Sequence, residues 1–406
     1  MNKKGLNILF LTVARIDSIA ERGIYTDLLR KFIKEGHHIT MITPSERRYN
    51  RKTQLIEEDG AKTLRIKTLN IQKTNAIEKG IGTLLLEKQF NRGIKKYLAE
   101  SKFDLILYST PPITLSRVIK KIKKRDNAGS YLLLKDIFPQ NAVDLGMFRQ
   151  NGLLHSFFRN KEKDLYEISD YIGCMSPENV NYLRKHNPGI PLEKIEICPN
   201  SIEIIDEPSL IESKKEIRKV FNIPEDVTLF LYGGNLGKPQ GISFLEEILK
   251  TNSDKSDRYF LIVGGGTEYS KLEALFNNYK FSNAKLIPYM EKSEYDRLMC
   301  GCDVGLIFLD NRFTIPNYPS RLLNYMEHRM PILAATDENT DVGKMANDNG
   351  YGFWCKNGDV DTFNALLERF VTEPQLISKM GENSYNFLTN NYTVDSSYNT
   401  IISHFN

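Results

Sequence analysis

A glycine-rich stretch, YGGNLGKPQG (residues 232–241), lies between an apolar run, VTLFL, and an amphipathic run, ISFLEEILK. Glycines between a strand and a helix let backbone N–H groups approach a ligand closely, and the N-terminus of the helix carries partial positive charge. Lys238 adds a full positive charge, so the stretch suits a phosphate group. It matches neither GxGxxG nor GxxxxGK[ST]. On its own, the stretch is explained equally well by a phosphate site and by a structural turn.

A second glycine-rich turn, LIVGGGTE (residues 261–268), also follows a predicted strand. A dinucleotide site would require GxGxxG spacing and an acidic residue at the end of the next strand to bind a ribose. Both are missing, so a nicotinamide cofactor is not expected.

The stretch YPSRLLNYMEHRMPILAAT (residues 318–336) combines polar and apolar residues on one predicted helix. Pro319 can open this helix, and Ser320 and Arg321 fall in its first turn. Asn324 lies one turn later, on the same face as Ser320. The first turn would suit a diphosphate, and the amide of Asn324 a ribose. The alternative is a buried helix with the apolar stripe Leu322, Leu323 and Met326. The two interpretations concern different faces of the helix, so both can hold.

Asp136 follows an apolar run in LLLKDIFPQNAVDLGM (residues 132–147) and falls at the end of a predicted strand. A carboxylate in that position could orient an acceptor hydroxyl or take its proton. An aspartate that caps a helix or orders a loop would look the same in the sequence. Both interpretations stay open for Asp136.

Basic residues gather in two places in the first half of the chain. One cluster consists of Arg117, Lys120, Lys121, Lys123, Lys124 and Arg125, and the other of Arg47, Arg48, Arg51 and Lys52. In residues 1–200 the basic residues are in excess by 13, whereas in the remainder the acidic residues are in excess by 9. This asymmetry suggests an anionic partner such as nucleic acid, an acidic membrane or a phosphorylated acceptor, although solvated surface charge also explains it. A membrane is favoured over RNA, because no aromatic residues lie among the basic ones as stacking platforms.

The overall composition indicates a soluble protein with two domains. A chain of 406 residues exceeds the size at which a single core usually stops growing. Its five cysteines form no CxxC pair, so neither a disulfide framework nor a zinc site is expected and a reducing compartment fits. The N-terminus lacks the features of a signal peptide, and no apolar run is long enough to span a bilayer. A cytoplasmic location is therefore expected.

Apolar runs of strand length alternate with amphipathic runs of helical length along the chain. Strands are predicted at residues 6–13, 37–44, 103–110, 130–137, 170–176, 194–201, 227–233, 258–266, 284–290, 303–309 and 331–336. Helices are predicted at residues 24–36, 115–125, 153–169, 178–186, 242–250, 269–279, 293–301 and 318–329, with more after residue 360. This alternation predicts α/β architecture, in which helices cover both faces of a parallel sheet. The polar residues 204–219 indicate a connection between two halves. Since open parallel sheets bind ligands at the carboxyl ends of their strands, two halves facing a central cleft would suit an enzyme that joins two substrates.

The order of the motifs resembles glycosyltransferase family 4, whose members adopt the GT-B fold. In that family a glycine turn with a basic residue is followed by V-G-x-G, an A-D-V-G-L-like strand and a helix of the form E-A-x-x-x-G-x-P-V-I. The similar stretches here are GGNLGKPQG, LIVGGG, CDVGLIFL and NYMEHRMPILA. NGYGFWCKNGDVDTFNALL resembles the family's segment near the ribose, and RGIYTDLLRKFIKEGHHITMIT, TPPITL and ICPNS extend the resemblance through the first half.

The chain departs from the family pattern at several positions. The family's E-x7-E pair would need acids where this chain has Pro316 and Asn324. The family's usual Arg and Lys in the glycine turn would fall at Asn235 and Gln240, so the charge is supplied by Lys238 instead. Many relatives have a histidine near the strand end occupied by Asp136, and this chain has none there.

GNLGKPQG, PSR and KDIFPQNAVDLGM are similar to a branch of capsule and O-antigen enzymes that resemble N-acetylfucosamine transferases. The resemblance implies transfer of an N-acetylated hexosamine or 6-deoxyhexosamine from a UDP-sugar to a lipid-diphosphate-linked saccharide in capsule, O-antigen or exopolysaccharide synthesis. It implies retention at the anomeric carbon, no metal and no cofactor. In a retaining reaction the leaving phosphate can itself take the acceptor proton, so Asp136 could be dispensable. The enzyme would be peripheral on the anionic inner face of the plasma membrane and would bind no nucleic acid.

The resemblance also assigns the domains and, together with the positions of Asp136 and of the basic clusters, gives the candidate sites. Residues 1–203 would form an acceptor-binding Rossmann-like domain, residues 204–385 a donor-binding Rossmann-like domain, and residues 386–406 a C-terminal helix that crosses back to the first domain. The catalytic candidates are Asp136, Lys238 and Arg321. The donor-binding candidates are Gly234, Asn235, Leu236, Gly237, Lys238, Gln240, Gly265, Tyr289, Pro319, Ser320, Arg321 and Asn324. The candidates on the acceptor and membrane side are Arg22, Gly23, Arg47, Arg48, Lys120, Lys121 and Lys124.

Two other classes of function remain compatible with the sequence. A UDP-sugar 2-epimerase uses the same two-domain fold, but it would need several acids in the cleft and no acceptor, and the basic first half argues against it. A non-catalytic sugar-binding or lipid-binding module would explain the missing E-x7-E pair.

Overall fold

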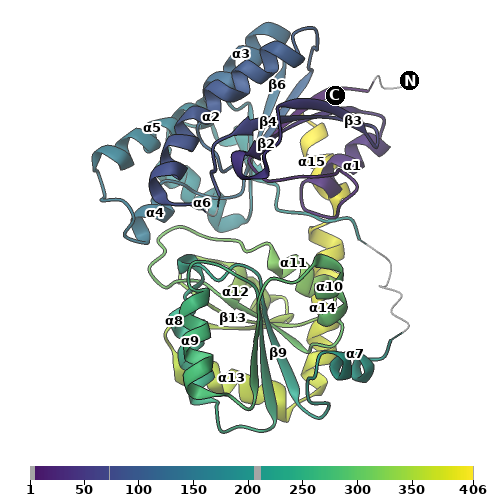
Figure 1. Ribbon diagram of the computed structural model, residues 1–406, viewed down its shortest axis with the longest axis vertical. Coiled ribbons are helices and arrows are strands. Elements are labelled where there is room, and N and C mark those ends of the chain that lie inside the picture. The colour runs from purple at the N-terminus through teal and green to yellow at the C-terminus, as the bar shows by residue number, and fades with distance from the viewer. Residues whose placement is uncertain (1–4, 73, 205–211, 406) are drawn as a thin grey trace. The chain divides into compact units, whose positions relative to one another are not determined.

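The computed structural model describes residues 5–72, 74–204 and 212–405. The chain forms two compact units, Met1–Glu203 with Thr393–Asn406 (unit 1) and Ile204–Tyr392 (unit 2). Each unit is built on a wholly or mainly parallel sheet with helices packed against it (Figure 1). The predicted fold class of two Rossmann-like parallel-sheet domains is therefore confirmed.

Unit 1 contains an eight-stranded sheet in the order β3-β4-β2-β1-β5-β6-β7-β8. The strands are β1 (Asn7–Leu11), β2 (His38–Glu46), β3 (Gln54–Glu58), β4 (Ala61–Thr68), β5 (Leu105–Ser109), β6 (Gly129–Leu134), β7 (Tyr171–Cys174) and β8 (Ile195–Ile197). All pairs are parallel except β3 with β4. The helices are α1 (Thr26–Lys34), α2 (Ala76–Tyr97), α3 (Ser116–Asp126), α4 (Gln140–Asp144), α5 (Leu153–Ile168), α6 (Pro177–His186) and α15 (Val394–Ile402).

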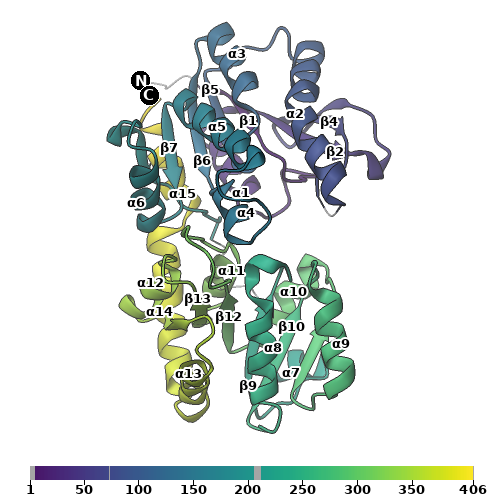
Figure 2. The same ribbon diagram turned by 90° about the vertical axis from the view of Figure 1, so that its left-hand side faces the viewer.

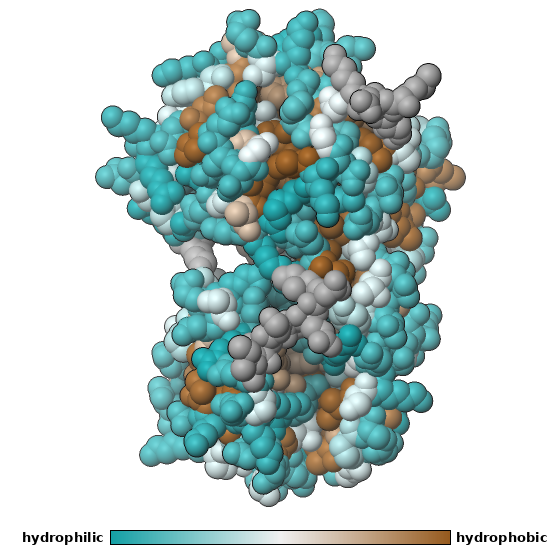
Figure 3. Space-filling model, turned by 90° about the vertical axis from the view of Figure 1, so that its right-hand side faces the viewer, coloured by the Kyte–Doolittle hydropathy of each residue, from teal (hydrophilic) through white to brown (hydrophobic). Residues whose placement is uncertain are grey.

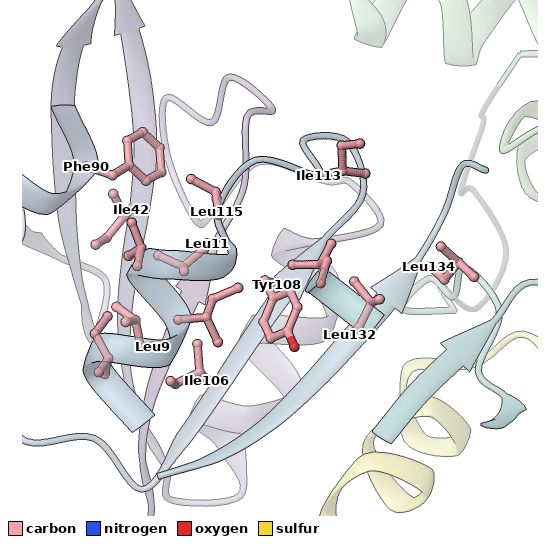
Figure 4. Packing of buried hydrophobic residues seen from close by; sticks show 14 of the residues in the cluster. Leu9, Leu11, Ile42, Phe90, Ile106, Tyr108, Ile113, Leu115, Leu132 and Leu134 are labelled. Atoms are coloured by element: carbon pink, nitrogen blue, oxygen red, sulfur yellow. The ribbon is translucent and has the colours of Figure 1, made fainter. Parts of the chain in front are cut away.

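Alternate residues of the central strands supply two cores, one on each face of this sheet. Leu9 and Leu11 of β1 face a core that also contains apolar residues of α2, α3, α5 and α6 (Figure 4). Ile8 and Phe10 face the opposite core, which α1 and α15 complete. The period of two along a strand is what sends neighbouring residues to opposite faces. The termini of the chain thus combine in one unit, because α15 packs on α1.

Unit 2 contains a six-stranded parallel sheet in the order β11-β10-β9-β12-β13-β14. Its strands are β9 (Thr228–Gly233), β10 (Arg258–Val263), β11 (Ala284–Ile287), β12 (Val304–Phe308), β13 (Ile332–Thr336) and β14 (Gly352–Lys356). Its helices are α7 (Lys214–Val220), α8 (Ile242–Thr251), α9 (Tyr269–Tyr279), α10 (Lys292–Met299), α11 (Arg321–Glu327), α12 (Val342–Asp348), α13 (Val360–Thr372) and α14 (Gln375–Asn391). The strand order reverses between β9 and β12, and such a switch point is where open parallel sheets bind ligands.

The segment predicted to connect the halves is partly a structural element of unit 2. Of residues 204–219, residues 205–211 lie outside the described part of the chain. Beyond them, Ser213 and Glu216 form a capping box that starts α7. The guanidinium of Arg218 is buried and lies 2.5 Å from the carboxylate of Asp303. The polar sequence around Arg218 predicted a linker, but the side chain of Arg218 bonds to Asp303, a buried residue 85 positions away.

The face shown in Figure 3 is mostly hydrophilic and is interrupted by apolar patches. Among the described helices, none combines the length and apolar character needed to cross a membrane.

Candidate functional site

The two glycine-rich turns of unit 2 lock together at the carboxyl ends of β9 and β10. The N–H of Gly234 donates to the carbonyl of Val263 at 2.9 Å, and the N–H of Leu236 donates to Gly265 at 3.0 Å. A Cβ at Gly264 would lie 1.9 Å from the carbonyl oxygen of Gly234. A Cβ at Gly266 would lie 2.3 Å from the oxygen of Leu236. Part of the glycine content is therefore needed for this contact between turns, a requirement that the sequence did not reveal.

The first turn leaves donors available for a ligand. Gly234 has φ +117°, a conformation that favours glycine. The chain then makes a short 3-10 turn over Lys238–Gln240 and enters α8 through Gly241. Within the part of the chain that the structure describes, the backbone N–H groups of Asn235 and Gly237 have no acceptor. Lys238 is exposed and has no ion-pair partner there.

Arg321 brings the glycine turn and the PSR motif together. Its Cζ lies 4.4 Å from the centre of the Tyr232 ring, and its Nη2 donates to Oε1 of Gln240 at 2.8 Å. A Cβ added to Gly234 would lie 3.6 Å from the same Nη2. The Nη1 of Arg321 is buried and has no hydrogen-bond partner. No carboxylate among the described residues pairs with this guanidinium, so its charge is uncompensated.

Three tyrosines surround this guanidinium, and all of them stay neutral. Burial raises the pKa of Tyr232 and Tyr295, and it raises the pKa of Tyr325 to about 12. The hydroxyl of Tyr325 accepts the N–H of Gly233 at 3.0 Å, which ties α11 to the end of β9. Sequence reasoning missed these residues. The available signals were that Tyr325 lies one helical turn after Arg321 and that Tyr232 directly precedes the glycines.

Helix α11 starts slightly later than predicted. It begins at Arg321, with Ser320 as the N-cap residue and Pro319 outside the helix. The predicted apolar stripe is buried, and Asn324 is partly buried on another face. The side-chain amide of Asn324 has no partner in the described residues, and its backbone oxygen accepts the N–H of His328 at 3.3 Å.

Two further donor-site candidates lie at the same edge of the sheet. Gly265 is exposed, with open space where a Cβ would be. Tyr289 follows β11 and is 72% exposed. Leu236 is instead fully buried in the core of unit 2, so only its backbone can face a ligand.

In unit 1, Asp136 lies two residues beyond β6. The side-chain amide of Asn141 donates to both of its carboxylate oxygens, at 2.9 and 3.1 Å, and the hydroxyl of Thr110 bonds to its backbone. Burial raises the pKa of Asp136, which the hydrogen bonds from Asn141 partly oppose. Burial raises the pKa of the nearby Tyr25 phenol, and the negative charge of Asp136 raises the pKa of Tyr25 further. A held carboxylate with raised pKa fits a group that accepts a hydrogen bond or a proton.

The candidates on the acceptor and membrane side divide into paired and unpaired groups. Arg22 donates to the carbonyl of Glu203 at 2.7 Å, and the N–H of Gly23 donates to Asp27 at 2.9 Å. Arg47 lies 3.0 Å from Glu78, and Arg48 lies 2.7 Å from Glu46. In contrast, Lys120, Lys121 and Lys124 are exposed on α3 and form no ion pair with the described residues. Among those residues there is also no group of three or more His, Cys, Asp and Glu side chains placed to hold a metal ion.

Comparison with known proteins gives consistent results. Residues 213–387 match the family described as glycosyl transferases group 1. The chain is 22% identical over 324 residues to the probable glycosyltransferase WbjE of Pseudomonas aeruginosa, covering 79% of this chain and 78% of that protein. It is 20% identical over 249 residues to the putative colanic acid biosynthesis glycosyl transferase WcaI of Escherichia coli, covering 60% of each. HepE of Anabaena, solved with UDP and glucose, has a similar structure, with a TM-score of 0.70, 12% identity and coverage of 98% of this chain and 99% of HepE.

Proposed function

We propose that this chain, a glycosyltransferase of the GT-B kind, transfers a sugar from a UDP-sugar to a lipid-diphosphate-linked saccharide during synthesis of a capsule, O-antigen or exopolysaccharide. The donor would bind at the glycine turns of unit 2 and the acceptor at the carboxyl edge of the sheet in unit 1. The sugar would be an N-acetylated hexosamine or 6-deoxyhexosamine, transferred with retention. Two relatives named as glycosyltransferases, one of them in colanic acid biosynthesis, support this class of product.

The observation that carries the proposal is the uncompensated guanidinium of Arg321. A charged group taken from water is costly unless it is paired. Arg321 has a tyrosine ring and a glutamine amide as partners, but no carboxylate among the described residues. A diphosphate would supply the missing negative charge, and arginine binds such oxygens with two parallel N–H groups. HepE, a neighbour in fold, was solved with UDP, which supports a uridine nucleotide as the donor carrier.

In the proposed reaction, the bond from the anomeric carbon to the diphosphate oxygen breaks, the acceptor hydroxyl oxygen bonds to the anomeric carbon, and UDP leaves. Arg321, Lys238 and the free N–H groups of the first glycine turn would stabilise the charge that develops on the leaving oxygen. Gln240 would hold the guanidinium in place through its 2.8 Å hydrogen bond. Asp136 would orient the acceptor hydroxyl, while the leaving phosphate takes the proton on the same face.

The direct test is the affinity for UDP of an Arg321→Met variant, measured by calorimetry. We expect at least tenfold weaker binding, since a charge-assisted contact to phosphate is lost. Arg312→Met is the matched control, because Arg312 is exposed and already pairs with Asp310 at 2.8 Å. Unchanged affinity in the Arg321 variant would contradict the diphosphate role.

The class of reaction needs a second experiment. The protein is incubated with a panel of UDP-sugars and a lipid-diphosphate-linked sugar, and the products are identified by mass spectrometry. Transfer to the lipid acceptor supports the proposal. Epimerisation of the donor without transfer would indicate a 2-epimerase, and no change of either substrate would indicate a binding module.

We also propose that the enzyme works on the inner face of the plasma membrane, because its acceptor is held there by a lipid. The unpaired cations Lys120, Lys121 and Lys124 support an anionic surface as partner. Basic residues close to such a surface contribute about 1 kcal/mol each.

A further inference from the structure

Most of the exposed large apolar side chains of unit 1 gather in two groups. At the start of α5, Leu153 is 93% exposed and Leu154 60%, and Phe157 lies on the same side. A further four such residues are Met147, before α5, and Ile81, Leu84 and Leu85 on α2. These seven make up half of the large apolar side chains that are exposed in the described residues. Apolar residues concentrated in this way mark an interaction surface more often than chance exposure does.

The helices that carry them lie side by side. Figure 2 looks onto the face of unit 1 where α2, α3 and α5 cover the sheet, and α3 contacts both of the others. Each of the three leads into the next parallel strand, so they run in the same direction. The amine of Lys123 donates to the carbonyl of Ile168 at 2.8 Å, which places the ends of α3 and α5 level. The N–H of Arg117 donates to the carboxylate of Glu87 at 2.8 Å, so the middle of α2 is level with the start of α3.

These contacts fix how far the apolar residues project. At 1.5 Å per residue, the turn from Leu153 to Phe157 extends roughly 6 to 12 Å beyond the first residue of α3. By the same rise, Ile81 to Leu85 extend roughly 2 to 8 Å beyond it. Both apolar tips therefore point toward the carboxyl edge of the sheet and reach past α3 by a similar distance.

Behind these tips, the exposed surface of α2 and α3 is basic. The exposed side chains are Lys88, Arg92, Lys95, Lys96, Arg117, Lys120, Lys121, Lys124 and Arg125. The acidic residues of these two helices, Glu78, Glu87 and Asp126, are only partly exposed. No fully exposed carboxylate interrupts the basic area within α2 and α3. Apolar tips followed by a basic belt are complementary to a bilayer whose headgroups are anionic.

We propose that the apolar residues of α2 and α5 insert into the interface of a bilayer that contains anionic lipid, while the basic belt behind them binds the headgroup phosphates. Proteins that lie on membranes bury apolar side chains about 5–10 Å deep, which is close to the projection of the tips. Lysine and arginine stems are long enough to keep their charges at headgroup level. This deepens the proposed function by naming the surface that reaches the lipid-linked acceptor, and it depends on residues outside the donor site.

Insertion can be observed directly by tryptophan fluorescence. The chain has a single tryptophan, Trp354 in unit 2, so a Trp354→Phe background is dark. In that background, Leu154→Trp should show blue-shifted emission and quenching by brominated lipid on vesicles of phosphatidylcholine with phosphatidylglycerol. The control is Leu192→Trp, since Leu192 is also exposed in unit 1 but lies in a turn whose Lys194 bonds to Ser169 at the C-terminal end of α5, opposite to the apolar tips. Equal behaviour at the two positions would overturn the proposal.

Vesicle flotation supplies the second test. The triple variant Leu153→Ser, Leu154→Ser, Phe157→Ser should bind at least tenfold less to vesicles containing phosphatidylglycerol, with unchanged UDP affinity and melting temperature. The matched control Leu192→Ser, Ile197→Ser removes exposed apolar side chains elsewhere and should bind normally. Replacing Lys120, Lys121 and Lys124 with Gln should weaken binding most at low salt, because electrostatic attraction is screened as salt rises.

The outcomes separate this proposal from the donor chemistry. Normal vesicle binding by the triple variant would overturn the insertion surface. A second result would also overturn it: the wild type is an oligomer and does not bind vesicles, and the triple variant is a monomer. In that case a second copy of the chain would cover the apolar residues. If Arg321→Met loses UDP binding but still binds vesicles, the proposed insertion surface is unaffected. If the wild type itself does not bind UDP, only the proposed function is refuted.

Discussion

Lys238 is the residue of the glycine turn whose positive charge has no ion-pair partner among the described residues. It is exposed, and no ion pair holds it among the described residues, so removing it should not unsettle the fold. We predict that Lys238→Ala raises the KM for the UDP-sugar about tenfold, which corresponds to ~1.4 kcal/mol of lost binding. Lys255→Ala is the control, because Lys255 is exposed near the opposite, amino end of β10. Normal donor kinetics in Lys238→Ala would remove the phosphate role from this residue.

Asp136 should make kcat decrease on the acid side of its pH profile. Burial holds its pKa above the usual value, so its carboxylate is lost earlier as the pH falls. If the charged form orients the acceptor, kcat drops as the pH falls through that raised pKa, and Asp136→Asn lowers kcat and removes this decrease. The exposed Asp164 of α5 provides the control substitution, Asp164→Asn. Full turnover with unchanged acceptor affinity in Asp136→Asn would show that the leaving phosphate needs no help.

The same pKa has a consequence for stability, with a definite sign. A raised pKa means that folding disfavours the charged carboxylate, and this cost is present above the folded pKa and disappears below it. Asp136→Asn should therefore raise the melting temperature relative to the wild type at neutral pH. The gain should shrink as the pH falls through the folded pKa. A gain that is independent of pH would show that the charge is not the cause.

At the scale of elements, the contact between the two glycine turns should be sensitive to a single methyl group. A Cβ at Gly264 would lie 1.9 Å from the oxygen of Gly234, and its φ of +148° is strained for any other residue. We predict that Gly264→Ala lowers the free energy of unfolding by about 1–3 kcal/mol. It should also weaken UDP binding, because the added methyl group displaces the first glycine turn. A Cβ added at Gly265 would lie in open space, so Gly265→Ala should have the melting temperature of the wild type. Equal melting temperatures for the two variants would contradict the locked turns.

Most of the strands and helices could be predicted because short-range apolar periodicity encodes them. The hairpin β3–β4, helices α2, α4 and α12 and strand β14 were missed, and α7 was predicted as part of a connection. Strand β3 is largely exposed, and the exposed Leu84 and Leu85 of α2 obscure a single apolar stripe. At the site, motif spacing pointed to Arg321, whose guanidinium lies beside the glycine turn, and its role in binding a diphosphate stays a prediction. Of the tyrosines around it, Tyr295 could not be predicted, because it meets Arg321 only after elements distant in sequence have packed together, whereas Tyr232 and Tyr325 had only the weak signals of their spacing.

At the scale of the whole molecule, unit 1 is assembled from both ends of the chain. Its final helix, α15, is held by the amine of Lys31, 2.6 Å from Asp395, and by the N–H of Val394, which donates to Ile202 at 3.1 Å. Ile401 of α15 is fully buried in the core that also contains α1. Everything between Ile204 and Tyr392 is therefore an insertion in the sequence of unit 1. A substitution that weakens the packing of α15 should therefore lower the stability of the whole of unit 1, including its first strands.

We predict that Ile401→Ala lowers the unfolding free energy of unit 1 by about 2–5 kcal/mol, the usual cost of such a buried truncation. Differential scanning calorimetry of the full chain should show the transition of unit 1 moved to lower temperature. The transition of unit 2, identified because UDP shifts it upward, should stay in place, since a ligand stabilises only the folded unit that binds it. Asn399→Ala, on the exposed side of α15, should change neither transition. An equal shift of both transitions in Ile401→Ala would mean that the chain unfolds as one cooperative body and that the two units are not independent in stability.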